Sequence, residues 1–125
     1  MPFDWKDYHT LADKLSRASD EASHRSSVSR AYYSAYSHAR QKLCYPERYR
    51  MTQAELRQHG GMHKLIIDKL LDSTGDPNKV IAGNELTALR IDRMKADYQE
   101  NATVDNVMAE NSVLVADLIR TTLLP

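Results

Sequence analysis

The sequence predicts an all-α protein, an up-and-down helical bundle of four long helices plus one short helix. Apolar residues recur every three or four positions through most of the chain, which is the period of helices that bury one face. Glycine and proline are rare, four of each in 125 residues, and occur chiefly between these periodic segments. Because most connections are short, neighbouring helices should be antiparallel. We therefore expect a single helical domain over residues 1–125.

Six segments carry the helical pattern, and local signals bound them. They cover residues 4–18, 23–43, 52–59, 62–72, 78–99 and 104–123. Asp4 can cap the first segment, whose apolar stripe begins at Trp5. The second segment should end before Tyr45-Pro46, because the residue before a proline disfavours helix.

The remaining segments begin and end at similar signals. Thr52 and Glu55 form a capping-box pattern that opens the short helix. A pair of glycines then ends it, since each glycine costs about 1 kcal/mol inside a helix relative to alanine. Asp76 is a cap with Pro77 at the first helical position. The residues expected to face inward in the last two segments are Val80, Ile81, Leu86, Leu89 and Met94, then Val104, Val107, Met108, Val115, Leu118, Ile119 and Thr122.

Composition narrows the class of protein. The chain has 17 basic and 17 acidic residues, so no net field draws it to nucleic acid or to an anionic membrane. An RNA-directed role must therefore rest on a local basic patch or on a partner. Cys44 is the single cysteine, which excludes an internal disulfide and fits a reducing compartment. No apolar run approaches the roughly 18 residues of a membrane span, and the sequence has no signal-peptide pattern. We therefore expect a cytoplasmic protein. We also predict that the protein has no cofactor.

The second predicted helix carries more polar chemistry than packing alone requires. Arg30, Tyr33 and Ser37 lie three or four residues apart, on a face turned away from the apolar stripe. One interpretation is a solvated flank whose Arg30 pairs with a carboxylate of another helix, Asp97 or Asp92. The other interpretation makes this face a subunit interface, where tyrosine and arginine are enriched, or the wall of a nucleotide groove.

Three histidines are candidate site residues. His38 lies at the edge of the buried stripe, where a histidine is more often a satisfied boundary group than a catalyst, and it would shape the same groove or interface. His59 and His63 have the i, i+4 spacing of two metal ligands on one helix. Because a stable site needs further ligands, we predict no metal site.

Arg57 and His63 carry chemistry that suits phosphodiester cleavage. Histidine titrates near neutrality and moves protons, while arginine binds phosphate with two donors. Residues six apart on an ideal helix are rotated by about 240°. Either the intervening glycines bring the two together, or Arg57 of one subunit meets His63 of the partner subunit. The alternative is a surface turn with incidental polar residues. Separately, Arg93 and Asp97 can form an i, i+4 ion pair.

Three separated pieces resemble landmarks of the HEPN superfamily, in the right order. They are Ser29-Arg30-Ala31-Tyr32-Tyr33 through His38-Ala39, then Gly61-Met62-His63-Lys64-Leu65-Ile66, then Arg90 through Ala96-Asp97-Tyr98. HEPN proteins are small all-helical proteins of prokaryotic stress and defence systems. The resemblance implies a HEPN-like bundle that commonly dimerises. In active members an Arg-x4-6-His motif from both subunits lines a metal-independent ribonuclease cleft, and this motif maps here onto Arg57 and His63.

The resemblance leaves functions of different classes open. The first is an RNA endonuclease that acts as a homodimeric toxin or effector in a prokaryotic defence or stress system, with Arg57 holding the scissile phosphate and His63 moving protons. The second is a non-catalytic HEPN-like module that binds a nucleotide or a protein partner, such as an antitoxin or a subunit of a defence complex. A structural helical adaptor is the third.

Overall fold

The structure, a computed structural model, describes residues 3–44 and 52–123. Its helices are α1 (Lys6–Ser16), α2 (Glu21–Cys44), α3 (Gln53–His59), α4 (Met62–Asp72), α5 (Pro77–Tyr98) and α6 (Asn106–Thr122). The ends of all of them lie within two residues of the predicted segments, which confirms the all-α fold class. The described residues form six helices and no strand, one for each predicted segment; the description as four long helices and one short helix left one of these segments out of the count.

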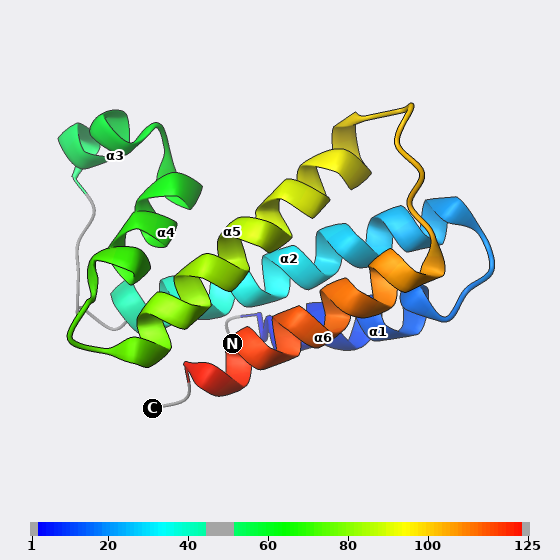
Figure 1. Ribbon diagram of the computed structural model, residues 1–125, viewed down its shortest axis with the longest axis horizontal. Coiled ribbons are helices and arrows are strands. Elements are labelled where there is room, and N and C mark those ends of the chain that lie inside the picture. Colours follow the sequence, from blue (N-terminus) through cyan, green and yellow to red (C-terminus); the bar gives the residue numbers. More distant parts are fainter. Residues whose placement is uncertain (1–2, 45–51, 124–125) are drawn as a thin grey trace.

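Helix α2 is the centre of the molecule. It contacts α1, α4, α5 and α6, and α5 and α6 lie across it while α3 and α4 stand together at one end (Figure 1). Its buried positions include Tyr32 as well as the serines Ser27 and Ser34. The Ser27 hydroxyl donates to the carbonyl oxygen of Ala12 at 2.7 Å, so this polar group is satisfied inside the core. The polar sequence of α2 is therefore that of a helix covered on most sides.

The predicted caps at Thr52 and Asp76 form, whereas α1 begins after Trp5 and Asp4 accepts the backbone N–H of Lys6 at 3.0 Å from one residue further out. Thr52 and Glu55 exchange the two hydrogen bonds of a capping box at the start of α3. Asp76 accepts the backbone N–H of Asn78 at 3.1 Å and so caps α5. Asp105 accepts the backbone N–H of Met108 at 2.9 Å, which starts α6 two residues later than predicted.

Two consecutive glycines separate α3 from α4. Gly60 and Gly61 have φ angles of +79° and +120°, which other residues adopt only with strain. The chain therefore turns between the two helices, and the predicted break at this point is confirmed. Helix α3 buries none of its residues and packs on α4.

Small side chains set the packing of α5 and α6. Ala82 and Gly83 of α5 are fully or almost fully buried, and a Cβ atom at Gly83 would lie 2.9 Å from Leu71 Cδ2. Larger residues expected to face inward are exposed instead: Ile81 and Met94 on α5, and Val107 and Leu118 on α6. Leu86, Leu89, Val104 and Ile119 are buried as predicted. Close approach of helix axes requires small contact residues, so alanines and Gly83 complete the buried stripes where the exposed large residues were expected.

Arg25 ties the C-terminal end of α5 to α2. Its guanidinium pairs with Glu21 at 3.0 Å and donates to the carbonyl oxygens of Lys95 at 3.3 Å and Ala96 at 3.0 Å. It also donates to the carbonyl oxygen of Ala102 in the loop before α6. The Lys95 carbonyl also accepts the backbone N–H of Gln99, so Arg25 adds a second donor there and supplies side-chain donors to the Ala96 and Ala102 carbonyl groups at and beyond the end of the helix. No described helix combines the length and apolar character that crossing a bilayer requires.

Candidate anion-binding site between α4 and α5

Aromatic and cationic side chains from three helices gather around His63. They are Tyr32, Tyr33 and Tyr36 of α2, His63 of α4, and Arg90 and Arg93 of α5, and we call them the Tyr–His–Arg cluster. The His63 ring is stacked on Tyr36, with ring centroids 4.1 Å apart and planes 10° from parallel. The Tyr33 ring meets it edge to face at 5.8 Å. These contacts fix the plane of the imidazole.

One hydrogen bond joins His63 to the core. The Tyr32 hydroxyl lies 2.6 Å from Nδ1 of His63, and Tyr32 is fully buried. Burial raises the pKa of Tyr32, so its hydroxyl stays protonated. Burial and then the charges of Arg90 and Arg93 lower the pKa of His63, so its ring is neutral at pH 7. Two neutral groups therefore share this bond.

Arg93 is a fully compensated cation. Its Nε donates to Asp97 at 2.9 Å, which is the predicted ion pair. Its Nη2 donates to the hydroxyl groups of Tyr33 at 3.0 Å and Tyr98 at 3.3 Å. The guanidinium also lies over the rings of Tyr32 and Tyr33. Arg93 therefore holds α5 against α2.

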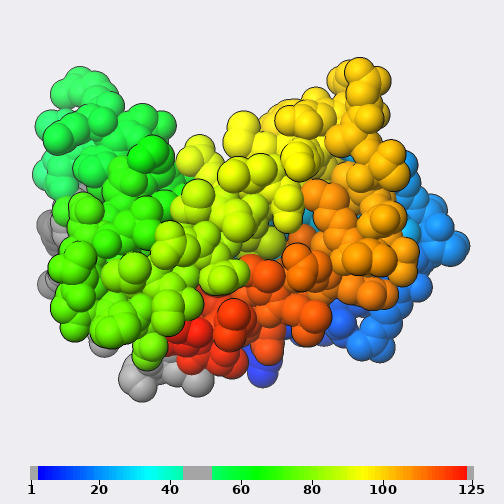
Figure 2. Space-filling model, in the orientation of Figure 1, coloured from blue at the N-terminus to red at the C-terminus, as the bar shows by residue number. Residues whose placement is uncertain are grey.

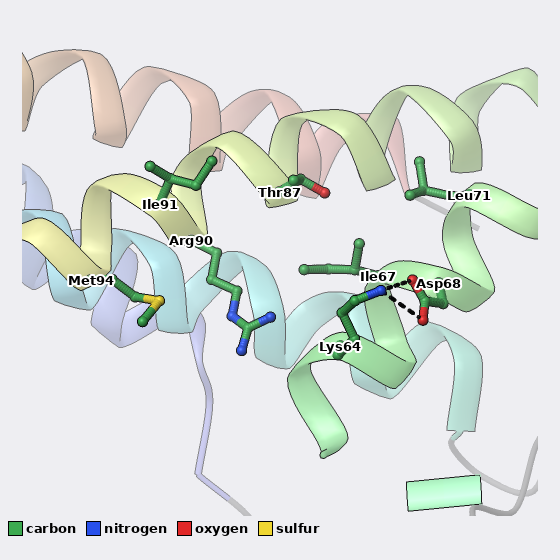
Figure 3. Close-up of a pocket in the computed structure, with 8 residues that line it drawn as sticks. All are labelled: Lys64, Ile67, Asp68, Leu71, Thr87, Arg90, Ile91 and Met94. Carbon is green, nitrogen blue, oxygen red and sulfur yellow. Dashed lines mark hydrogen bonds and ion pairs between the residues drawn. The ribbon is translucent and has the colours of Figure 1, made fainter. Parts of the chain in front are cut away.

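Unlike Arg93, Arg90 has no oppositely charged partner among the residues that the structure describes. It is half-buried, its Nε is buried, and within residues 3–44 and 52–123 it has neither a hydrogen-bond partner nor an ion pair. In Figure 3 the guanidinium points into the space between α5 and α4. Its charge acts on the pKa of both His63 and Tyr32, so Arg90 connects the cluster to this space.

A groove runs between α4 and α5 at Arg90. Its volume is about 370 Å³, and its lining residues are Lys64, Ile67, Asp68, Leu71, Thr87, Arg90, Ile91 and Met94. Figure 2 shows the green surface of α4 meeting the yellow-green surface of α5 along this line. Two cationic side chains and one carboxylate line it, which leaves a net charge of one positive.

Asp68, the one carboxylate among the residues that line the groove, pairs with Lys64 and not with Arg90. Lys64 Nζ lies 2.8 Å and 3.1 Å from the two carboxylate oxygens of Asp68 (Figure 3). His59 Nδ1 lies 2.7 Å from the same carboxylate. Partial burial raises the pKa of Asp68, but the hydrogen bonds from Lys64 and His59 outweigh it and the net shift is downward. The uncompensated positive charge of the groove is therefore that of Arg90.

Arg57 and His63 lie in different surroundings. Arg57 is exposed on α3, and no hydrogen bond, ion pair or cation–π contact joins it to His63 among the described residues. The arginines whose charges affect His63 are Arg90 and Arg93 of α5. The turn at the two glycines therefore does not pair the predicted residues within one chain. A meeting of Arg57 with His63 of the partner subunit stays a prediction.

The predicted partner of Arg30 was wrong. Its guanidinium lies over the Tyr8 ring of α1 at 5.1 Å, and among the described residues it forms no ion pair with Asp92 or Asp97. The neighbouring residue Ser29 faces α5 instead, and its hydroxyl donates to Asp97 at 3.2 Å. Consecutive residues of a helix point in directions about 100° apart. Ser29 therefore faces α5, whereas Arg30, the next residue, faces α1.

Ser37 and His38 are packing residues of α2. Ser37 is 3% exposed, so the prediction that it lines an interface or groove was wrong. The reason is that α2 is covered by four other helices. Burial, then Arg120 and Lys42, lowers the pKa of His38 to about 4. His38 thus lies beside Arg120 of α6 as a neutral boundary group, and it is not among the residues that line the groove.

His38 should make the protein sensitive to mild acid. Folding lowers its pKa from 6.5 to about 4, so between these values the unfolded chain binds a proton that the folded chain does not. We expect the free energy of unfolding to fall as the pH is lowered from 6.5 toward 4. Urea unfolding at a series of pH values should give a smaller slope for His38→Gln. An equal slope in both proteins would contradict this role.

Sequence inspection missed Arg90, although a signal was present. Arg90 directly follows the buried Leu89, and no carboxylate occurs three or four residues before or after it. Arg93 by contrast has Asp97 four residues later. The pattern in the sequence that indicates this site is therefore an arginine that adjoins the apolar face of its helix and has no acidic residue three or four positions away.

No metal centre is visible in the part of the chain that the structure describes. No three His, Cys, Asp or Glu side chains gather there. His59 bonds to Asp68 while His63 bonds to Tyr32, so the two histidines at i, i+4 have different partners. Comparisons with known protein families, with curated proteins and with solved structures find no match.

Proposed function

We propose that this protein is a non-catalytic, HEPN-like helical module that binds a 5′-mononucleotide in the groove between α4 and α5, with the phosphate at Arg90. The observation that carries the proposal is the half-buried guanidinium of Arg90, which has no carboxylate partner among the described residues. A buried charge is costly unless an opposite charge accompanies it. Arginine binds phosphate through two parallel N–H groups.

The remainder of the groove suits a base and a sugar. Four apolar side chains line it, from Ile67, Leu71, Ile91 and Met94. Its volume of about 370 Å³ lies within the range of about 300–1,000 Å³ for small-molecule sites, which are mostly apolar with a few placed polar groups. The resemblance to the HEPN superfamily supports the same class, since many of its members are non-catalytic binding modules.

Calorimetric titration tests the proposal. The protein should bind 5′-AMP at least about tenfold more tightly than adenosine, because hydrogen bonds to a charged group contribute about 1.5–3 kcal/mol. Arg90→Met should remove this difference. Lys95→Met is the matched control, because Lys95 is an exposed cation of α5 that does not line the groove. Equal affinity for 5′-AMP and adenosine, or unchanged 5′-AMP binding by Arg90→Met, would contradict the proposal.

RNA cleavage is the second candidate function, and His63 favours it. A neutral imidazole beside two guanidinium groups can exchange protons near a bound phosphate. Arg57 would reach this histidine only from the partner subunit, so this candidate includes the homodimer. Cleavage should then survive EDTA and leave a 2′,3′-cyclic phosphate, and His63→Ala should slow it by at least about 10². Intact RNA after incubation with the purified protein would reject cleavage.

A further inference from the structure

We infer that Tyr32 is a positioning residue, which holds the neutral His63 ring with its proton on Nε2 so that the ring donates a second hydrogen bond to the ligand phosphate. The inference rests on the proposed function and names the phosphate class that the site selects. It begins from the 2.6 Å contact between the Tyr32 hydroxyl and Nδ1 of His63.

The direction of this hydrogen bond follows from burial. Tyr32 is fully buried, and Nδ1 of His63 is the one partner of its hydroxyl among the described residues. If Nδ1 carried the proton, the hydroxyl hydrogen would be buried without an acceptor, which is costly. The hydroxyl therefore donates to Nδ1, and the single proton of the neutral ring is on Nε2.

The surroundings of His63 keep it neutral while leaving that proton available. Arg90 and Arg93 face it from α5, and the three tyrosines of the cluster face it from α2. On α3 and α4, His59 and Lys64 both bond to Asp68, Lys69 pairs with Glu55, and Arg57 is exposed on α3. No described residue accepts a hydrogen bond from Nε2.

The resulting donor set selects a terminal phosphate. The Arg90 fork can engage two phosphate oxygens at once. His63 does not line the groove itself but lies beside Arg90, and its Nε2 is not a buried atom, so its N–H group supplies a further donor for a third oxygen of a phosphate bound at Arg90. A phosphate monoester has three unbridged oxygens, whereas the phosphodiester of an RNA strand has two. We therefore expect the site to prefer a 5′-mononucleotide over an internal phosphate of RNA.

Tyr32→Phe tests this role against Tyr8→Phe, a ring substitution on α1 that lies outside the cluster. Long-range ¹H–¹⁵N spectra of the parent at pH 7.5 should show an unprotonated Nδ1 and a protonated Nε2 for His63. The parent should bind 5′-AMP about tenfold more tightly than the methyl ester of its phosphate. Tyr32→Phe should reduce this preference several-fold and leave adenosine affinity unchanged, because the proton of the neutral His63 ring is then no longer held on Nε2 by the hydroxyl.

Each result separates the two claims. A protonated Nδ1 in the parent, or a Tyr32→Phe protein that keeps the full preference for 5′-AMP, overturns the role of Tyr32. An unprotonated Nδ1 together with no binding of 5′-AMP by the parent overturns the proposed function, while Tyr32 still sets the tautomer. Tyr8→Phe should match the parent in both measurements, which shows that losing a tyrosine hydroxyl elsewhere has no effect.

Discussion

Replacing Arg90 with methionine should stabilise the free protein by about 1 kcal/mol. Methionine keeps an unbranched apolar chain in the groove and removes a half-buried charge that has no counterpart among the described residues. For a domain of this size the melting temperature should rise by about 3–6 °C. Thermal and urea unfolding measure both quantities. A gain in stability with a loss of nucleotide binding is the expected signature of a residue kept for its ligand.

Arg93→Met is the matched control and should act in the opposite direction. Arg93 is three residues from Arg90 on the same helix, but it bonds to Asp97, Tyr33 and Tyr98. Its loss takes the cationic partner from Asp97, which keeps only the Ser29 hydroxyl, and a donor from two tyrosine hydroxyl groups, which should cost about 1–3 kcal/mol. If Arg90→Met destabilised the protein as much as Arg93→Met, Arg90 would be a structural residue and the site would lose its main support.

Arg25→Ala should lower the free energy of unfolding by about 2–4 kcal/mol. The side chain donates to three carbonyl oxygens at and beyond the end of α5 and pairs with Glu21. Removing it takes this donor from the part-buried carbonyl groups of Ala96 and Ala102, which costs more than the net contribution of an average hydrogen bond. Urea unfolding at neutral pH measures the change.

Arg17→Ala provides the comparison for Arg25. Arg17 also forms an i, i+4 pair, with Asp13 at 2.9 Å, but its side chain is 76% exposed. Exposed pairs of this kind contribute about 0–1 kcal/mol. Equal destabilisation by the two substitutions would contradict the view that Arg25 acts through the carbonyl groups of the α5 end.

Local signals in the sequence were enough to place the helices. Caps and breaks depend on residues within four positions of one another, and those at Thr52, Asp76 and Gly60-Gly61 appear as predicted. The ion pair of Arg93 with Asp97 is local for the same reason. Local signals of this kind thus predict where a helix begins and ends, and which side chains of the same helix pair with each other.

The buried face of each helix was harder to predict. Hydrophobicity favoured Met94 and Leu118 as inward residues, yet both are exposed. Leu86, Leu89 and Ile119 are buried as predicted, but alanines and Gly83 occupy the closest contacts, because helices that approach closely have no room for larger side chains. Helix α2 was misjudged in the opposite sense, since Ser37 is buried. The small polar residues of α2 are buried because four other helices pack around this helix, and they do not form a solvent-exposed face.

The candidate site depends on contacts that no local pattern contains. Tyr32 and His63 are 31 positions apart in the sequence and meet because α4 packs against α2. Arg90 reaches the groove from a third helix. The resemblance singled out segments that include all three residues, but it directed attention to Arg57, whose exposed position on α3 gives it no contact with His63 among the described residues.

The most direct test of the central claim is to observe the Arg90 side chain while a nucleotide is added. The Nε–H group of Arg90 gives its own signal in ¹H–¹⁵N spectra and can be assigned with the Arg90→Met protein. Titration with 5′-AMP should move this signal to a saturating limit, whereas adenosine should leave it in place. A signal that stays fixed while 5′-AMP shifts resonances of α1 or α3 would place the ligand elsewhere and contradict the account.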